Sequence, residues 1–119
     1  MAAMEDRLEL NLLMDFYGPL LTDHRQEVLR LYCEEDLTLQ EIAEQLEITR
    51  QGVFDALNKA RRQLEDYEKK LGLVNRYRVI TGEAERGLRA LKGVSPQPGG
   101  EPAMERARQA LENILRNER

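Results

Sequence analysis

Residues 37–57, LTLQEIAEQLEITRQGVFDAL, contain two helix-start signals close together, and this pair constrains the fold more than any other feature. Thr38 is placed to cap one helix, and Glu41 can reach back from the first turn to complete a capping box. Thr49 is placed to cap the next helix in the same way. The sequence therefore predicts a short helix, a tight turn and a second helix that begins at Arg50.

Two short helices joined by a tight turn must approach closely, and this requires small and aliphatic residues at fixed places. Ala43 is the small residue midway along the first helix, Ile48 follows the turn, and Val53 lies on the second helix. Leu46 and Leu57 complete the predicted buried cluster. These spacings predict a helix-turn-helix, the unit whose second helix presents its N-terminal turns to the bases of DNA.

The turn itself departs from the usual pattern, because Glu47 stands where glycine is common. Glycine is common there because the chain adopts a left-handed conformation. A residue with a side chain costs about 1–2 kcal/mol in that conformation. Either the protein accepts this cost, or its turn has a slightly different geometry.

The remaining sequence predicts more helices and no strand, so the expected fold class is an all-α helical bundle. Gly18-Pro19 ends the first helix, and either Thr22 or Asp23 caps the next. Gly82 weakens a later helix and allows a break beside it. The expected organisation is a helix-turn-helix domain at 1–72, a helical extension at 73–92, a proline- and glycine-rich linker at 93–102 and a C-terminal helix at 103–119.

Charge is distributed unevenly along the 119 residues, whose net charge is −4. Residues 1–70 carry 16 acidic and 9 basic side chains, a net −7, whereas residues 71–119 carry 6 acidic and 9 basic ones, a net +3. Domains that bind nucleic acid are typically basic. The acidic half holds the predicted helix-turn-helix, which argues against tight nonspecific DNA binding.

Three further features bear on the compartment. Cys33 is the single cysteine, so it forms no disulfide within the chain, and its place on an apolar stripe predicts a buried, inert thiol. No stretch approaches the roughly 18 apolar residues of a membrane-spanning helix, and the acidic N-terminus lacks the apolar core of a signal peptide. We therefore expect a cytoplasmic protein without membrane insertion.

The exposed face of the second helix is the first candidate binding surface. Arg50 matches guanine and Gln51 matches adenine, while Phe54 can stack or touch a thymine methyl group. Asp55 would repel phosphate, although it can accept a hydrogen bond from cytosine. The alternative is a solvated helix face with Phe54 covered by a neighbouring helix. The candidate positions are Thr49, Arg50, Gln51, Phe54, Asp55, Asn58, Lys59, Arg61 and Arg62.

A second basic cluster follows in the positively charged half of the chain. Arg76 and Arg78 flank Tyr77, and further bases follow up to Lys92. Arginine interleaved with tyrosine suits phosphate contact and stacking on unpaired bases, a common way of holding RNA. The alternative is a charged face that only aids solubility.

The sequence predicts no enzyme, no cofactor and no metal site. His24 is the only histidine, and it lies in the first turn of a predicted helix without the partners of a catalytic or zinc site. The carboxylates are spread over helix surfaces, and no glycine-rich loop is spaced to hold phosphate.

The stretch from 12 to 73 closely resembles the YlxM-like bacterial proteins, above all in DFYGPLLT at 15–22 and ITRQGVFDALNKA at 48–60. Its layout also resembles region 4 of bacterial sigma factors. The resemblance makes Asp55 and the Gln51-Gly52 pair family features, whereas relatives often carry glycine in place of Glu47.

What the resemblance implies is a regulatory or accessory role in the signal recognition particle pathway. The implied partners are DNA or signal recognition particle RNA, and the particle's GTPase protein. The alternative is a sequence-specific DNA-binding transcriptional regulator unconnected with the particle. Single helix-turn-helix units usually act as dimers, so we also consider a homodimer formed through the C-terminal helices.

Overall fold

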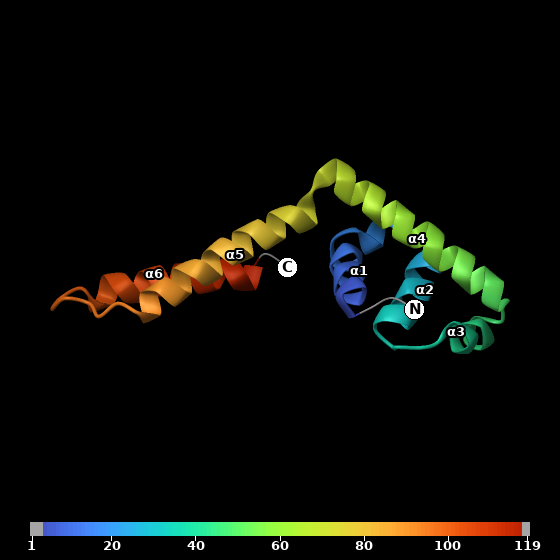
Figure 1. Cartoon of the computed structure of the whole chain (residues 1–119), viewed down its shortest axis with the longest axis horizontal. Coiled ribbons are helices and arrows are strands. Elements are labelled where there is room, and N and C mark those ends of the chain that lie inside the picture. Colours follow the sequence, from blue (N-terminus) through green and yellow to red (C-terminus); the bar gives the residue numbers. More distant parts are fainter. Residues whose placement is uncertain (1–3, 118–119) are drawn as a thin grey trace. The chain divides into compact units, whose positions relative to one another are not determined.

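The computed structural model describes residues 4–117, and within that range every regular element is helical. The all-α prediction is therefore confirmed. Residues 1–3 and 118–119, which the sequence assigned to the first domain and to the terminal helix, lie outside the described range. The elements are α1 Met4–Tyr17, the short 3-10 helix η1 Gly18–Leu20, α2 Asp23–Cys33, α3 Leu39–Leu46, α4 Arg50–Leu71, α5 Leu73–Lys92 and α6 Glu101–Asn117 (Figure 1).

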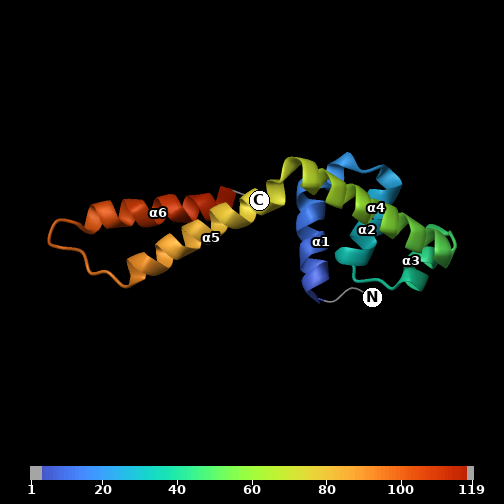
Figure 2. The same ribbon diagram turned by 45° about the horizontal axis from the view of Figure 1, so that its top comes forward.

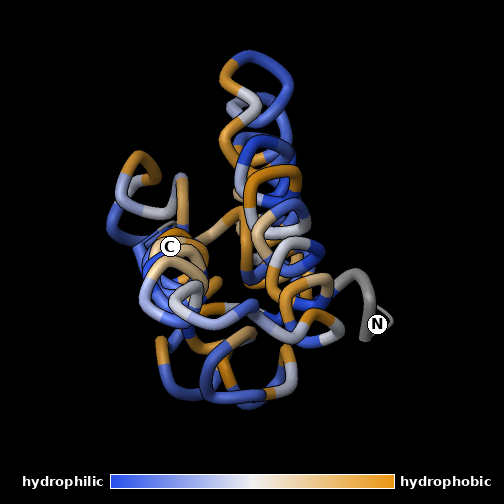
Figure 3. Tube along the Cα trace, turned by 90° about the vertical axis from the view of Figure 1, so that its left-hand side faces the viewer, coloured by the Kyte–Doolittle hydropathy of each residue, from blue (hydrophilic) through white to orange (hydrophobic). Residues whose placement is uncertain are grey.

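Contacts divide the chain into two units, residues 1–74 and residues 75–119. In the first unit, the long helix α4 contacts α1, α2 and α3, so it is the helix against which the others pack (Figure 1). Hydrophobic segments recur between hydrophilic ones along the helices (Figure 3), as expected of helices with one apolar face. The largest fully buried side chains are Tyr17, Val28, Leu29, Leu31, Ile42, Val53, Leu64 and Val74.

All three predicted caps are present in the first unit. The Thr22 hydroxyl accepts a hydrogen bond from the Arg25 amide at 3.3 Å, so Thr22 is the cap of α2. Thr38 and Glu41 form the complete capping box, with bonds of 3.1 and 3.0 Å. The Thr49 hydroxyl accepts from the Gly52 amide at 2.9 Å. Local sequence chemistry alone therefore sets where these three helices begin.

The turn between α3 and α4 keeps its usual left-handed geometry in spite of its glutamate. Glu47 has φ 56° and ψ 43°, and the amides of Glu47 and Ile48 both donate to the Ala43 carbonyl. Of the two interpretations of Glu47, the structure therefore shows the first, in which the protein accepts the conformational cost.

Replacing Glu47 with glycine is expected to stabilise the protein by about 1 kcal/mol, because glycine adopts the left-handed conformation without a side-chain penalty. Glu44→Gly is the matched control. It lies on the exposed face of α3, where glycine should instead cost roughly 1 kcal/mol. The midpoints of urea unfolding measure both changes, and a destabilised Glu47→Gly variant would contradict this account of the turn.

The junction between α4 and α5, at residues 68–74, is held by polar contacts that the sequence did not predict. Gly72 ends α4 with φ 65°. The Tyr17 hydroxyl donates to the Glu68 carboxylate at 2.6 Å and accepts from the Leu73 amide at 3.0 Å. The same Glu68 oxygen accepts from the Val74 amide at 2.9 Å. Burial, reinforced by the bond to Glu68, raises the pKa of Tyr17. These bonds satisfy the first amides of α5.

The second unit is a hairpin in which α6 runs back beside α5 (Figure 2). A break near Thr81-Gly82 does not occur, because α5 is one continuous helix. The Thr81 hydroxyl bonds back to the Tyr77 carbonyl at 2.8 Å, within the preceding turn. Gly87 allows close approach, since a Cβ there would lie 2.9 Å from the Leu111 Cδ1 atom of α6.

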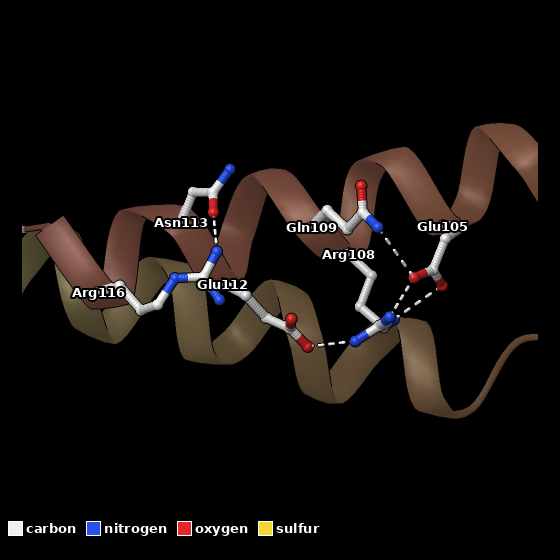
Figure 4. A network of polar contacts seen from close by, with 6 residues as sticks. All are labelled: Glu105, Arg108, Gln109, Glu112, Asn113 and Arg116. Carbon is white, nitrogen blue, oxygen red and sulfur yellow. Dashed lines mark hydrogen bonds and ion pairs between the residues drawn. The ribbon is translucent and has the colours of Figure 1, made fainter.

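The terminal helix α6 begins at Glu101, earlier than the predicted start at 103 and inside the predicted linker. Proline is tolerated in the first turn of a helix, which explains why Pro102 does not delay the start. The polar face of α6 is bonded within the helix (Figure 4). Arg108 bonds to both Glu105 and Glu112, and Arg116 bonds to Asn113.

Candidate nucleic-acid interface

The buried contact between α3 and α4 sets the position of the candidate surface. Ala43 and Val53 are buried as predicted, and Leu46, Ile48 and Leu57 pack against the same core from partly buried positions. The predicted helix-turn-helix cluster is thereby confirmed. Because one face of α4 is held in this cluster, the opposite face of its N-terminal half is fixed toward solvent.

That exposed face, here called the α4 surface, consists of the positions that the sequence singled out. Phe54 exposes 48% of its surface, so the described helices do not cover it. Asn58 and Arg61 are half-buried. The exposed members are Thr49, Arg50, Gln51, Phe54, Asp55, Lys59 and Arg62. Arg50, Gln51, Phe54 and Asp55 lie on the first turns of the second helix, the part that reads DNA in this kind of unit, and Lys59 and Arg62 lie further along it.

Two members of the α4 surface are joined to each other. The Gln51 Nε2 atom donates to the Asp55 Oδ1 atom at 3.0 Å, one helical turn away. Their spacing of four on a helix is the sequence signal for such a pair. Asp55 therefore has a hydrogen-bond partner within the α4 surface itself.

Charge on the α4 surface is positive but bordered by acids. Arg50, Lys59 and Arg62 contribute exposed positive charge on α4. On α3 and the turn, the nearest charged residues are acidic and exposed: Glu41, Glu44 and Glu47. A ligand docking along α4 can therefore meet few phosphates before it meets negative charge, which favours a small, specific contact over broad electrostatic binding.

Arg76 and Arg78 lie on α5 and are exposed, while Tyr77 between them is half-buried. They belong to the second unit, so they form a candidate surface separate from the α4 surface.

Cys33 is less buried than the sequence predicted. Cys33 is half-buried, and burial raises the pKa of its thiol to about 11, so the thiol stays protonated at neutral pH. His24 is exposed on α2.

Among residues 4–117, no three histidine, cysteine or acidic side chains gather in a way that could hold a metal ion. None of the described helices is both long and apolar enough for a membrane crossing.

Comparison with known proteins identifies the family to which the chain belongs. The family model described as "Putative helix-turn-helix protein, YlxM / p13 like", UPF0122, matches residues 4–83. The chain belongs to this family. A UPF0122 protein of Desulforamulus reducens is 43% identical over 106 residues, covering 76% of this chain and 91% of the relative. One from Caldanaerobacter subterraneus subsp. tengcongensis is 48% identical over 82 residues, covering 69% and 70%. A third, from Thermoanaerobacter sp., is 46% identical with the same coverage.

The UPF0122 match spans the whole helix-turn-helix and the first part of α5, including Arg76 and Arg78, but not α6. The resemblance to YlxM-like proteins is thereby confirmed. Membership in a helix-turn-helix family indicates nucleic-acid binding as the class of function.

Proposed function

We propose that this protein binds nucleic acid through the α4 surface, in the cytoplasm, in a regulatory or accessory role in the signal recognition particle pathway. One observation carries the binding part of the proposal. The first turns of α4 expose Arg50, Gln51 and Phe54 to solvent, while the opposite side of the same turns is locked into the core by Val53. A reading helix needs this arrangement, because its side chains must reach base edges from a rigid support.

Each exposed side chain has a distinct part in this proposal. Arg50 offers the planar fork that matches guanine, and Phe54 offers an apolar contact for a thymine methyl group or an unpaired base. Lys59 and Arg62, further along α4, supply phosphate contacts that set the docking position but not the sequence.

The link to the signal recognition particle rests on the resemblance to YlxM-like proteins. It names two partners beside DNA, the RNA of the particle and its GTPase protein. Arg76 and Arg78 on α5 support the RNA, because they present exposed charge beside Tyr77. The alternative function is a sequence-specific DNA-binding transcriptional regulator unconnected with the particle, which the α4 surface supports equally well.

A homodimer through the C-terminal helices belongs to the same proposal. Helix-turn-helix units usually bind paired half-sites as dimers. The hairpin has apolar side chains exposed for such contact: Val79, 56% exposed, and Ile114, 38% exposed. Two chains bound for each duplex is the stoichiometry expected of this dimer.

The test is a footprint on the protein by nuclear magnetic resonance, with isotope-labelled full-length chain titrated with duplex DNA and, separately, with signal recognition particle RNA. Amide signals of residues 49–62 are expected to shift because that segment carries the contact. Shifts confined to residues 75–92 would transfer binding to the α5 surface, and no shift with either ligand would contradict nucleic-acid binding altogether. Strong shifts with duplex DNA alone would favour the alternative regulator.

A further inference from the structure

We propose that Asp55 is a positioning residue that holds the Gln51 side chain for reading adenine in the major groove of duplex DNA. This inference rests on the proposed function, and it adds the base that is read and the device that orients the reader. The observation that carries it is the 3.0 Å bond from Gln51 Nε2 to Asp55 Oδ1, on the exposed face of α4.

The chemistry of the amide makes this bond directional. An amide has one acceptor oxygen and a nitrogen with two donor hydrogens. Adenine presents an acceptor and a donor side by side in the major groove, and glutamine meets both with its oxygen and one N–H. The Gln51 nitrogen donates to Asp55, and because it carries two hydrogens, one N–H can bond Asp55 while the other remains for adenine. Asp55 cannot donate to the amide oxygen when ionised, so the bond fixes which end of the amide is which.

The placement of a carboxylate on this surface fits such a role. Asp55 is exposed on the same helix as the positively charged side chains of Arg50, Lys59 and Arg62. On its own it would repel phosphate and weaken binding. As the acceptor for Gln51, Asp55 lowers the affinity for DNA but makes the protein prefer one base over the others. Specificity of this kind suits a surface with few phosphate contacts.

Duplex DNA is the ligand that this geometry favours over duplex RNA. The major groove of B-form DNA admits an α-helix and shows a distinct donor and acceptor pattern for each base pair. The major groove of an RNA helix is too deep and narrow for side chains to read. A side chain oriented for a major-groove edge is therefore suited to DNA.

The experiment compares three chains in selection from a random duplex library, followed by affinity measurements on the selected site and on the site with its adenine replaced. Wild type should prefer the adenine site by roughly tenfold or more. Asp55→Asn should bind more tightly because a negative charge is gone. It should keep a weaker adenine preference, because its amide oxygen can still accept from Gln51 while its amide nitrogen can also donate to the Gln51 oxygen. Asp55→Ala should also gain affinity but lose most of the preference, since nothing then orients the Gln51 amide.

A matched control comes from α3, where the Gln40 Nε2 atom donates to the Glu44 Oε1 atom at 3.2 Å with the same spacing. Glu44→Ala removes an equal charge and an equal acceptor, and it should leave the base preference unchanged. The inference is overturned if Asp55→Ala keeps the adenine preference. It is also overturned if wild type selects cytosine and Asp55→Asn loses that selection, which would mean that Asp55 reads a base directly. Duplex binding without any base preference overturns this inference alone, whereas binding to no nucleic acid overturns the proposed function with it.

Discussion

Replacing Leu64 with alanine is expected to lower the free energy of unfolding by about 2–5 kcal/mol, because truncating a buried leucine removes apolar contacts and leaves a cavity. Leu64 lies on α4, and its side chain is fully buried in the first unit. The helices α1, α2 and α3 all contact α4, so a cavity in the buried face of α4 weakens the packing of the first unit.

Leu71→Ala is the matched control for this prediction. Leu71 is also a leucine on α4, but 56% of its surface is exposed. Its truncation should change stability by less than about 0.5 kcal/mol. Urea unfolding followed by circular dichroism measures both variants, and the midpoint should fall for Leu64→Ala with little change in slope. Equal midpoints for the two variants would contradict the placement of the core.

The helix-turn-helix could be predicted from sequence because its determinants are local. Thr38 and Glu41 lie within one turn of each other, and so do Thr49 and Gly52, so capping needs no knowledge of distant residues. The spacing of Ala43, Val53 and Leu57 reports a packing that involves only two neighbouring helices. The exposed positions of the α4 surface are predictable for the same reason, since they are the positions of the helix that do not take part in this local packing.

Contacts between distant residues could not be predicted in the same way. Tyr17 and Glu68 are separated by 51 residues, and neither carries a local signal for their bond. Arg7 stacks over the Tyr32 ring at 4.7 Å and forms an ion pair with Asp36, which is equally invisible in the sequence. Such pairs depend on how α1 packs against the other helices of the first unit, and the spacing of apolar residues along the sequence does not predict this packing.

The C-terminal helices show a different limit. Gly82 lowers helix propensity, and this indicated a break that does not occur in the continuous helix α5. At Gly87 the missing side chain is what lets Leu111 of α6 approach. Propensity counts only the cost of glycine within a helix, so it cannot detect the benefit of glycine between helices.

Replacing both Lys59 and Arg62 with alanine is expected to weaken binding to duplex DNA by about tenfold or more at low salt, because each side chain contacts a phosphate in this account. Both residues are exposed on α4, beyond the turns that read bases. Base preference should stay the same, since phosphate contacts position the helix without reading the sequence.

The control for this pair removes the same charge from the same helix. Lys69 and Lys70 are exposed in the last turn of α4, and Lys70 is paired with Asp66 at 3.0 Å. Lys69→Ala with Lys70→Ala therefore tests whether net charge alone governs binding. It should leave affinity nearly unchanged, because the proposed contact extends along α4 only as far as Arg62.

The central claim is that the α4 surface is where nucleic acid binds, and the salt dependence of duplex binding tests it most directly. Each phosphate contact contributes about 0.9 to the slope of log affinity against log salt concentration. The Lys59→Ala, Arg62→Ala double variant should therefore show a slope shallower than wild type by about 2. The Lys69→Ala, Lys70→Ala variant should match the wild-type slope. Equal slopes for wild type and the first double variant would contradict the claim.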